Sequence, residues 1–166
     1  MLPAHRRFLL LEQGIGSAGI NFAINGAIAW LLFRQMAIVP LWGQQSIAGD
    51  TIGTTFFLPF FTCLIVTRLA QRRVGSGGLP ALGWRRESRP ALGWMPATTF
   101  RRALALGAVC TLVVAPPTLI ALAALDVTDL SFSCFLAFKA TFAAGLAAVV
   151  TPIIALGAIA DVGAGE

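Results

Sequence analysis

Residues 132–160 read FSCFLAFKATFAAGLAAVVTPIIALGAIA, and Lys139 is the one charged side chain among them. A helix rises about 1.5 Å per residue, so this stretch is more than long enough for a hydrocarbon core of about 30 Å. Three further apolar stretches reach the length of a membrane span: residues 8–33, 47–69 and 103–125. The sequence therefore predicts an all-α polytopic membrane protein, in which four transmembrane helices form a single domain over residues 1–166.

The composition agrees with this class. Hydrophobic residues make up 57% of the chain and charged residues 11%, whereas an average soluble domain has about 25% charged residues. The first stretch has Ala27-Ile28-Ala29 at the spacing of a signal-peptide cleavage site, but its apolar run continues to Phe33. We therefore expect it to remain in the protein as a span rather than to be removed as a signal peptide.

The basic residues gather at the ends of the spans. The formal charge is +5, and only Arg34 falls in the two short connections that follow the first and third spans. By the positive-inside rule, both termini and residues 71–100 should face the cytoplasm from an inner (plasma) membrane. This placement argues against a nucleic-acid partner. Ten arginines lie at the N-terminus and around the long middle segment: Arg6, Arg7, Arg68, Arg72, Arg73, Arg85, Arg86, Arg89, Arg101 and Arg102.

Groups suited to catalysis or cofactor binding are scarce. Cys63, Cys110 and Cys134 have no spacing typical of a metal site. His5 is the one histidine, tyrosine is absent, and no nucleophile and base pair can be identified. We therefore predict a protein without a metal, a cofactor or an enzymatic activity.

The middle segment contains a short repeat. Pro-Ala-Leu-Gly-Trp occurs at residues 80–84 and again at residues 90–94, with arginines between the copies. Tryptophan beside arginine is typical of a segment that lies among headgroups and meets anionic lipid. The alternative is a duplicated, solvated linker without a specific partner, because one repeated pentapeptide is a weak signal. The residues expected at the headgroups are Trp84, Arg85, Arg86, Arg89 and Trp94.

Prolines lie near the middle of three spans. Each removes a backbone hydrogen-bond donor, so we expect the second, third and fourth spans to be kinked. Broken helices in mid-membrane are a feature of transporters, although proline is common in membrane helices generally. These prolines are Pro59, Pro116, Pro117 and Pro152.

One face of the first span is built from small residues, since Gly19, Ala23 and Ala27 recur every four positions. Such a face lets another helix approach closely, within the chain or in a second copy. Asn21 and Asn25 flank this face, and amides in hydrocarbon usually bond to a neighbouring helix. We therefore expect close helix packing around the first span.

Lys139 is the costliest residue for a lipid environment. It lies about 12 Å below the outer end of the fourth span at about 1.5 Å per residue, where an unpaired lysine costs about 2.5 to 3.5 kcal/mol. Asp50, near the outer start of the second span, is the best-placed counter-ion. The sequence predicts an intramembrane polar cluster of Lys139, Asp50 and Asn25, with Asn21 deeper. This cluster is either a structural ion pair that fixes helix order, or an anion or proton site reached from outside.

Glu12 lies a short way inside the cytoplasmic end of the first span. Arg68 and Arg101 are expected at the same boundary. We therefore predict a cytoplasmic-side ion pair between Glu12 and one of these arginines, which would set the position of the helices.

Two functions from different classes fit this pattern. A structural or accessory subunit of a membrane assembly fits the small-residue first span, the short connections and the lack of catalytic groups. A small transporter or channel for protons or small ions, oligomeric because four spans rarely enclose a pathway alone, fits the prolines and the intramembrane charges. An enzyme acting on lipid comes third. We expect the accessory subunit, with the transporter as the alternative, and either a homo-oligomer or a larger membrane complex.

Overall fold

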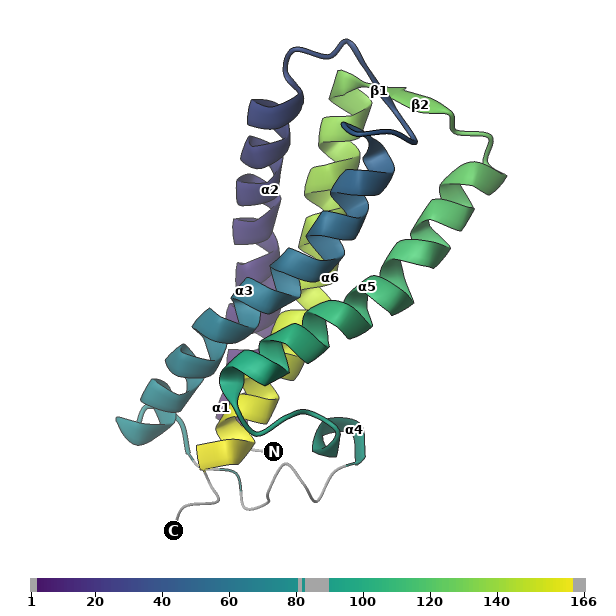
Figure 1. Ribbon diagram of the computed structural model, residues 1–166. Helices are drawn as coiled ribbons and strands as arrows, with labels where there is room; N and C mark the ends of the chain where they lie inside the picture. Colours follow the sequence, from purple (N-terminus) through teal and green to yellow (C-terminus); the bar gives the residue numbers. More distant parts are fainter. Residues whose placement is uncertain (1–2, 81, 83–89, 163–166) are drawn as a thin grey trace.

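The computed structural model describes residues 3–80, 82 and 90–162. Within them lie four helices that are long and apolar enough to cross a membrane, which confirms the predicted all-α class and number of spans (Figure 1). They indicate a multi-pass membrane protein. The first is continuous to Phe33, and its winding divides it into α1 (Pro3–Arg7), η1 (Phe8–Gly16) and α2 (Ser17–Phe33). The others are α3 (Ile47–Gly75), α5 (Thr99–Ala124) and α6 (Phe132–Val162).

All four long helices extend beyond the predicted spans at one end. α3 continues past Leu69 to Gly75, and α5 begins at Thr99 rather than at Ala103. Both extensions carry arginines, which hydropathy excludes from a span but which helices accommodate well. α3 ends close to Gly77, whose φ of 75° is a left-handed conformation that glycine adopts without steric cost.

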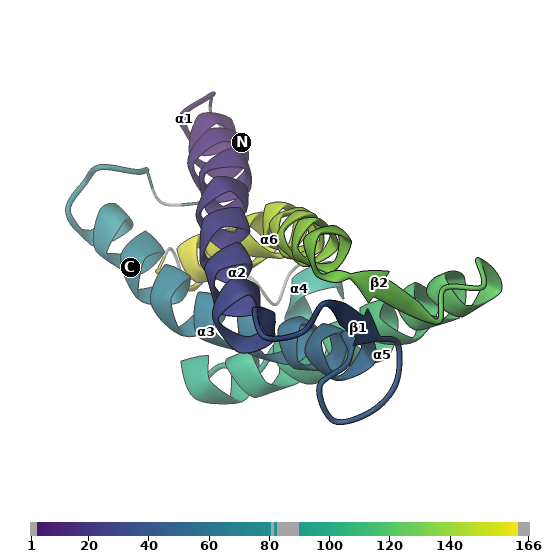
Figure 2. The same cartoon turned by 90° about the horizontal axis from the view of Figure 1, so that it is seen from above.

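α6 lies at the centre of the bundle. α2 packs on one side of it and α3 on another, while α5 packs against α3 (Figure 2). Small side chains permit the close approach on which helix packing in lipid depends. The contact faces of α6 follow this rule, because several of their alanines are fully buried: Ala143, Ala147, Ala155, Ala158 and Ala160.

α3 and α5 approach each other closely at Gly107. A Cβ atom at this position would lie 3.0 Å from the carbonyl oxygen of Phe56 and 3.0 Å from the ring of the same residue. Packed interiors leave no room for such a contact without a shift of the backbone. Phe56 also stacks on Phe60, with the ring centroids 6.0 Å apart. The missing side chain of Gly107 therefore sets the distance between these two helices.

The segment η1 is a π-helix, a wide winding that is rare and usually limited to a single turn. The sequence analysis did not predict it. Gln13 and Gly14 are buried in this segment, while Glu12 is exposed. A Cβ atom at Gly14 would lie 3.9 Å from the Ala148 carbonyl oxygen, an ordinary van der Waals distance, so η1 packs against α6 at this point.

A two-stranded antiparallel sheet closes one end of the bundle, which we call the sheet end. β1 (Ile38–Pro40) pairs with β2 (Asp129–Ser131) (Figure 1). Next to it, the Leu41 N–H donates to the Thr128 carbonyl over 2.8 Å. The sheet is absent from the sequence prediction, because strands of three residues are too short to show an alternating pattern. It ties the connection between α2 and α3 to the connection between α5 and α6.

Both ends of the described chain lie at the opposite end of the bundle, which we call the terminal end (Figure 1). The connection between α3 and α5 folds there and includes the short helix α4 (Pro90–Gly93). Leu82 and Leu92, the leucines of the two Pro-Ala-Leu-Gly-Trp copies, are each 5% exposed and join the main core with Leu79 and Met95. The repeat thus supplies two core residues, which anchor this connection to the bundle, while most of its other described residues are exposed.

The prolines expected to kink three spans all lie inside helices. Hydroxyl groups nearby donate to carbonyls of the preceding turn, as Thr118 does to Val114 over 2.7 Å. The kinks themselves stay a prediction. The positions are Pro59 in α3, Pro116 and Pro117 in α5, and Pro152 in α6.

Candidate functional site

A groove of about 710 Å³ runs between α2 and α3, and residues of α6 form part of its floor. Two apolar lips border the groove, one on each helix. The residues of each lip recur every four positions, which places them on one face of their helix. The floor carries polar side chains instead. The groove therefore has an apolar rim that faces the surroundings of the bundle, and an interior in which polar side chains lie beside the buried Leu58 and Val66. The lip residues, all largely exposed, are Ile20, Ile24 and Ile28 from α2, and Phe57, Phe61, Ile65 and Leu69 from α3.

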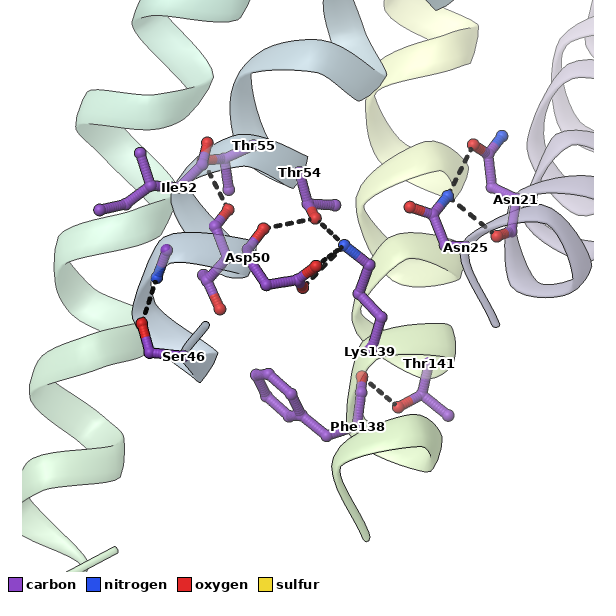
Figure 3. A network of polar contacts seen from close by, with 12 residues as sticks. Asn21, Asn25, Ser46, Asp50, Ile52, Thr54, Thr55, Phe138, Lys139 and Thr141 are labelled. Atoms are coloured by element: carbon purple, nitrogen blue, oxygen red, sulfur yellow. Dashed lines mark hydrogen bonds and ion pairs between the residues drawn. The ribbon is translucent and has the colours of Figure 1, made fainter. Parts of the chain in front are cut away.

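Lys139 and Asp50 form an ion pair in this groove (Figure 3). Lys139 Nζ lies 2.7 Å from Asp50 Oδ2 and donates a hydrogen bond of 2.8 Å to Asp50 Oδ1. It also donates to the hydroxyl of Thr54. An ammonium group has three donors, and both of these acceptors come from α3. Because Lys139 is only 4% exposed, its charge is balanced by the Asp50 carboxylate, and the Thr54 hydroxyl adds a hydrogen bond.

The first turn of α3 holds Asp50 in place. The Ser46 hydroxyl caps the helix by accepting a hydrogen bond of 3.1 Å from the Gly49 N–H. A carboxylate in the first turn is favoured by the unpaired N–H groups and by the helix dipole. Thr54 Oγ1 donates to the Asp50 carbonyl over 2.7 Å. The lone pairs of the Thr54 hydroxyl oxygen therefore remain available to accept from the Lys139 ammonium.

Asn21 and Asn25, the other members of the predicted cluster, line the same groove but do not join the ion pair (Figure 3). Asn25 Nδ2 donates to the Asn21 carbonyl over 3.1 Å, and Asn21 Nδ2 donates to the Ser17 carbonyl over 2.9 Å. In the part of the chain that the structure describes, neither amide bonds to Lys139 or Asp50. The expected bonds of these amides to another helix are therefore replaced by bonds within α2, because a short polar side chain reaches the preceding turn of its own helix readily.

Ser17 makes the hydrogen bond between helices that the asparagines were expected to make. Ser17 Oγ donates to Thr151 Oγ1 over 2.9 Å and to the Ala147 carbonyl over 3.3 Å. This contact joins the start of α2 to α6 at the floor of the groove. It anchors the lower part of the groove independently of the Lys139–Asp50 pair.

The sequence analysis missed several polar residues of the groove. A signal for two of them was available, because polar residues at positions 13, 17, 21 and 25 recur every four positions, the spacing of one helix face. Thr54 follows Asp50 by four positions and was expected on the same polar helix face, whereas position 151 carried no comparable signal, since single threonines are common in membrane helices. With the predicted residues they form the polar floor, which consists of Gln13, Ser17, Asn21, Asn25, Asp50, Thr54, Lys139 and Thr151.

Glu12 pairs with Arg73, whose Nη2 lies 3.0 Å from Glu12 Oε2. This corrects the predicted partners, because neither Arg68 nor Arg101 forms an ion pair with Glu12 within the described ranges. α3 continues to Gly75, which brings Arg73 rather than Arg68 to the level of η1. The two side chains are 46% and 45% exposed, and surface pairs of this kind contribute about 0 to 1 kcal/mol.

A second ion pair lies at the terminal end. Arg102 is 1% exposed, and its Nη2 lies 2.6 Å from Asp161 Oδ2. Its guanidinium also donates to the carbonyls of Pro96 over 3.1 Å and Ala97 over 3.3 Å. Arg102 therefore joins the start of α5, the connection before it and the end of α6. The sequence analysis had assigned this arginine to topology alone.

Most of the predicted headgroup segment lies outside the described residues, namely Trp84, Arg85, Arg86 and Arg89. Trp94 is described, and it is exposed just after α4. Its contact with lipid headgroups stays a prediction.

The small-residue face of α2 is left uncovered. Gly19, Ala23 and Ala27 are all exposed, and a Cβ atom added at Gly19 would meet nothing within 4 Å. α2 packs on α6 through a different face, where a Cβ atom at Gly26 would lie 3.6 Å from that of Ala140. Ala23 and Ala27 border a second, smaller groove whose other side includes Leu136 and Ala137 of α6, so no helix of the described chain packs closely on this face.

The three cysteines are free thiols in separate environments, since Cys63 is buried, Cys110 half-buried and Cys134 exposed. Over the described ranges, no group of three or more His, Cys, Asp or Glu side chains is placed to hold a metal ion. The absence of a metal or cofactor from the whole chain stays a prediction.

Comparison of the chain with known protein families, curated proteins and solved structures gave no match.

Proposed function

We propose that this chain is a small transport protein of an inner membrane, and that the groove between α2 and α3 is its pathway. The main support is the Lys139–Asp50 pair, which borders an open groove with a polar floor. Charged residues in membrane helices are costly, and they commonly mark the routes of ions and substrates. The groove measures about 710 Å³, whereas one water molecule in the liquid takes about 30 Å³. An ion pair that only fixed helix order would not need this space beside it.

The proposal includes an orientation. The terminal end carries arginines of α3 and α5, such as Arg73 and Arg101, whereas the connections at the sheet end carry only Arg34. By the positive-inside rule the terminal end then faces the cytoplasm. The Lys139–Asp50 pair would lie in the outer half of the membrane, and the Glu12–Arg73 pair at the cytoplasmic mouth of the groove.

A transport pathway has to be reached by water from both sides of the membrane, together or in turn. Cysteine labelling tests this without knowledge of the substrate. In a variant whose three native cysteines are replaced by serine, Asn21→Cys and Thr62→Cys place a thiol on the groove. An impermeant thiol reagent, added to right-side-out or to inside-out vesicles, should label both positions in both preparations.

Two further positions serve as controls. Ala143→Cys, at a fully buried site of α6, should stay unlabelled in both preparations. Ser76→Cys, at an exposed site just after α3, should be labelled from one side only and so reports the orientation. Labelling of the groove positions from one side only, or from neither, would contradict a transport pathway.

A second candidate function is an accessory subunit of a larger membrane assembly. The uncovered face formed by Gly19, Ala23 and Ala27 favours it, because such a face suits close packing against another helix. Purification in mild detergent tests this candidate. A fixed larger partner, together with a groove that no reagent reaches, would favour the accessory role, whereas self-association alone is also compatible with an oligomeric transporter.

A further inference from the structure

The lips of the groove leave it open toward the side of the bundle. α2 and α3 both pack on α6, and the groove occupies the space between them. Ile24 on one lip and Phe61 on the other are each more than half exposed. In a bilayer these side chains would contact hydrocarbon, while the floor behind them is polar. A molecule with one polar and one apolar part could therefore keep its apolar part in the lipid and place its polar part on the floor.

The dimensions fit such a molecule better than a bare ion. Ligand sites for organic molecules typically measure about 300 to 1,000 Å³, and the groove measures about 710 Å³. Along α3 its lining extends from Asp50 to Leu69, which is about 28 Å at about 1.5 Å per residue. This covers most of a hydrocarbon core of about 30 Å.

The charges along the groove balance each other. Lys139 is paired with Asp50 near the sheet end, and Glu12 is paired with Arg73 near the terminal end. The rest of the polar floor consists of hydroxyls and amides, which are neutral. A headgroup with a net charge would leave one member of a pair facing a like charge, and unbalanced charges in a low-dielectric site are strongly disfavoured. A headgroup that carries both signs can exchange partners with the Lys139–Asp50 pair without this penalty.

We propose that the groove conducts a zwitterionic amphiphile of the phosphoethanolamine class, and this inference rests on the transport function proposed above. The phosphate would bind the Lys139 ammonium, and the amine would bind the Asp50 carboxylate in place of Lys139. The hydroxyls and amides of the floor, among them Ser17 and Asn21, would replace water around the headgroup along the groove. The acyl chains would remain outside the Ile24 and Phe61 lips.

Reconstitution with labelled lipids tests this directly. Proteoliposomes of phosphatidylcholine receive a trace of phosphatidylethanolamine or of phosphatidylglycerol, each labelled with a fluorophore on an acyl chain so that the headgroup stays intact. An impermeant reductant added outside quenches the label in the outer leaflet only. The protein should expose the inner-leaflet phosphatidylethanolamine to quenching at a rate roughly tenfold above that of phosphatidylglycerol, which corresponds to about 1.4 kcal/mol of discrimination.

Variants of the groove test whether the lipid movement depends on the Lys139–Asp50 pair. Lys139→Ala and Asp50→Asn should reduce the rate for phosphatidylethanolamine to that of protein-free vesicles. Thr54→Val removes only the hydroxyl beside the pair and should slow the movement while the protein stays monodisperse. Thr141→Ala, which alters an exposed threonine elsewhere on α6, should keep the native rate.

The outcomes separate this inference from the transport function. Equal rates for the two lipids would overturn the charge-balance argument. No lipid movement, with groove cysteines still labelled from both sides, would overturn the amphiphile while leaving the transport function intact. No lipid movement and no labelling would overturn both.

Discussion

Lys139 and Asp50 are 89 residues apart in the sequence, and the Lys139 Nζ lies 2.7 Å from Asp50 Oδ2. The contact joins α6, the central helix, to the first turn of α3. It also places a pair of opposite charges beside a groove that opens toward the surroundings of the bundle. The pair therefore has two separable properties, its contribution to stability and its access to the groove.

Removal of one partner should destabilise the protein strongly. Lys139→Leu leaves the Asp50 carboxylate without its counter-ion, and breaking a buried pair in this way typically costs about 3 to 5 kcal/mol. Thermal unfolding in detergent, followed by circular dichroism, should show a clear fall in Tm. Thr141→Leu on the same helix is the matched control and should change Tm little. An unchanged Tm for Lys139→Leu would show that the pair is not formed.

The contact between α3 and α5 should tolerate no side chain at Gly107. Gly107→Ala places a methyl group 3.0 Å from the Phe56 carbonyl oxygen, and overpacking of this kind costs about 1 to 3 kcal/mol. Gly145→Ala is the control, because a Cβ atom there meets nothing within 4 Å and alanine favours a helix. The unfolding temperature should fall for Gly107→Ala and hold or rise for Gly145→Ala, and the reverse order would refute this packing.

The two neighbouring arginines at the start of α5 should differ sharply in their contributions to the stability of the protein. Arg102→Ala removes the buried partner of Asp161 and the donors to two carbonyls, so we expect a loss of about 3 kcal/mol. Arg101 is exposed, and Arg101→Ala should change stability by no more than about 0.5 kcal/mol. Limited proteolysis provides a second measurement, since Arg102→Ala should release the connection before α5 to cleavage and Arg101→Ala should not.

The Glu12–Arg73 pair should matter little for stability. Both side chains are nearly half exposed, so Glu12→Gln should cost less than about 1 kcal/mol, and added salt should reduce the difference further. Denaturant titration at low and high salt checks this. A loss as large as that of Lys139→Leu would contradict this expectation and would mean that both pairs fix the order of the helices.

Much of the fold followed from local sequence. Long apolar stretches such as residues 132–160 predicted the four helices, because length and hydropathy alone decide whether a helix suits a bilayer. The exact ends of the helices could not be predicted from the sequence. The arginines near the end of α3 lower the hydropathy of that stretch, but they do not interrupt the helix, which continues to Gly75. The π-helix at Phe8–Gly16 and the sheet at the connections depend on packing between distant segments, for which the sequence pattern held no signal.

The candidate site could be predicted in part from the sequence. A single lysine and a single aspartate near the same predicted depth were enough to suggest the Lys139–Asp50 pair. Glu12 was given the wrong partner, because the level that Arg73 reaches depends on how far α3 continues. The groove itself could not be predicted, since it results from α2 and α3 both packing on α6 and not filling the space between them.

The most direct test of this account is transport by the double variant Lys139→Leu with Asp50→Leu. Replacement of a buried ion pair by apolar residues is often neutral or stabilising, so the double variant should fold and unfold at or above the native Tm. We predict that it nevertheless fails to support the transbilayer lipid movement that we propose for the native protein in proteoliposomes. Movement at the native rate by a folded double variant would show that the pair only supports the structure, and would contradict its role in the pathway.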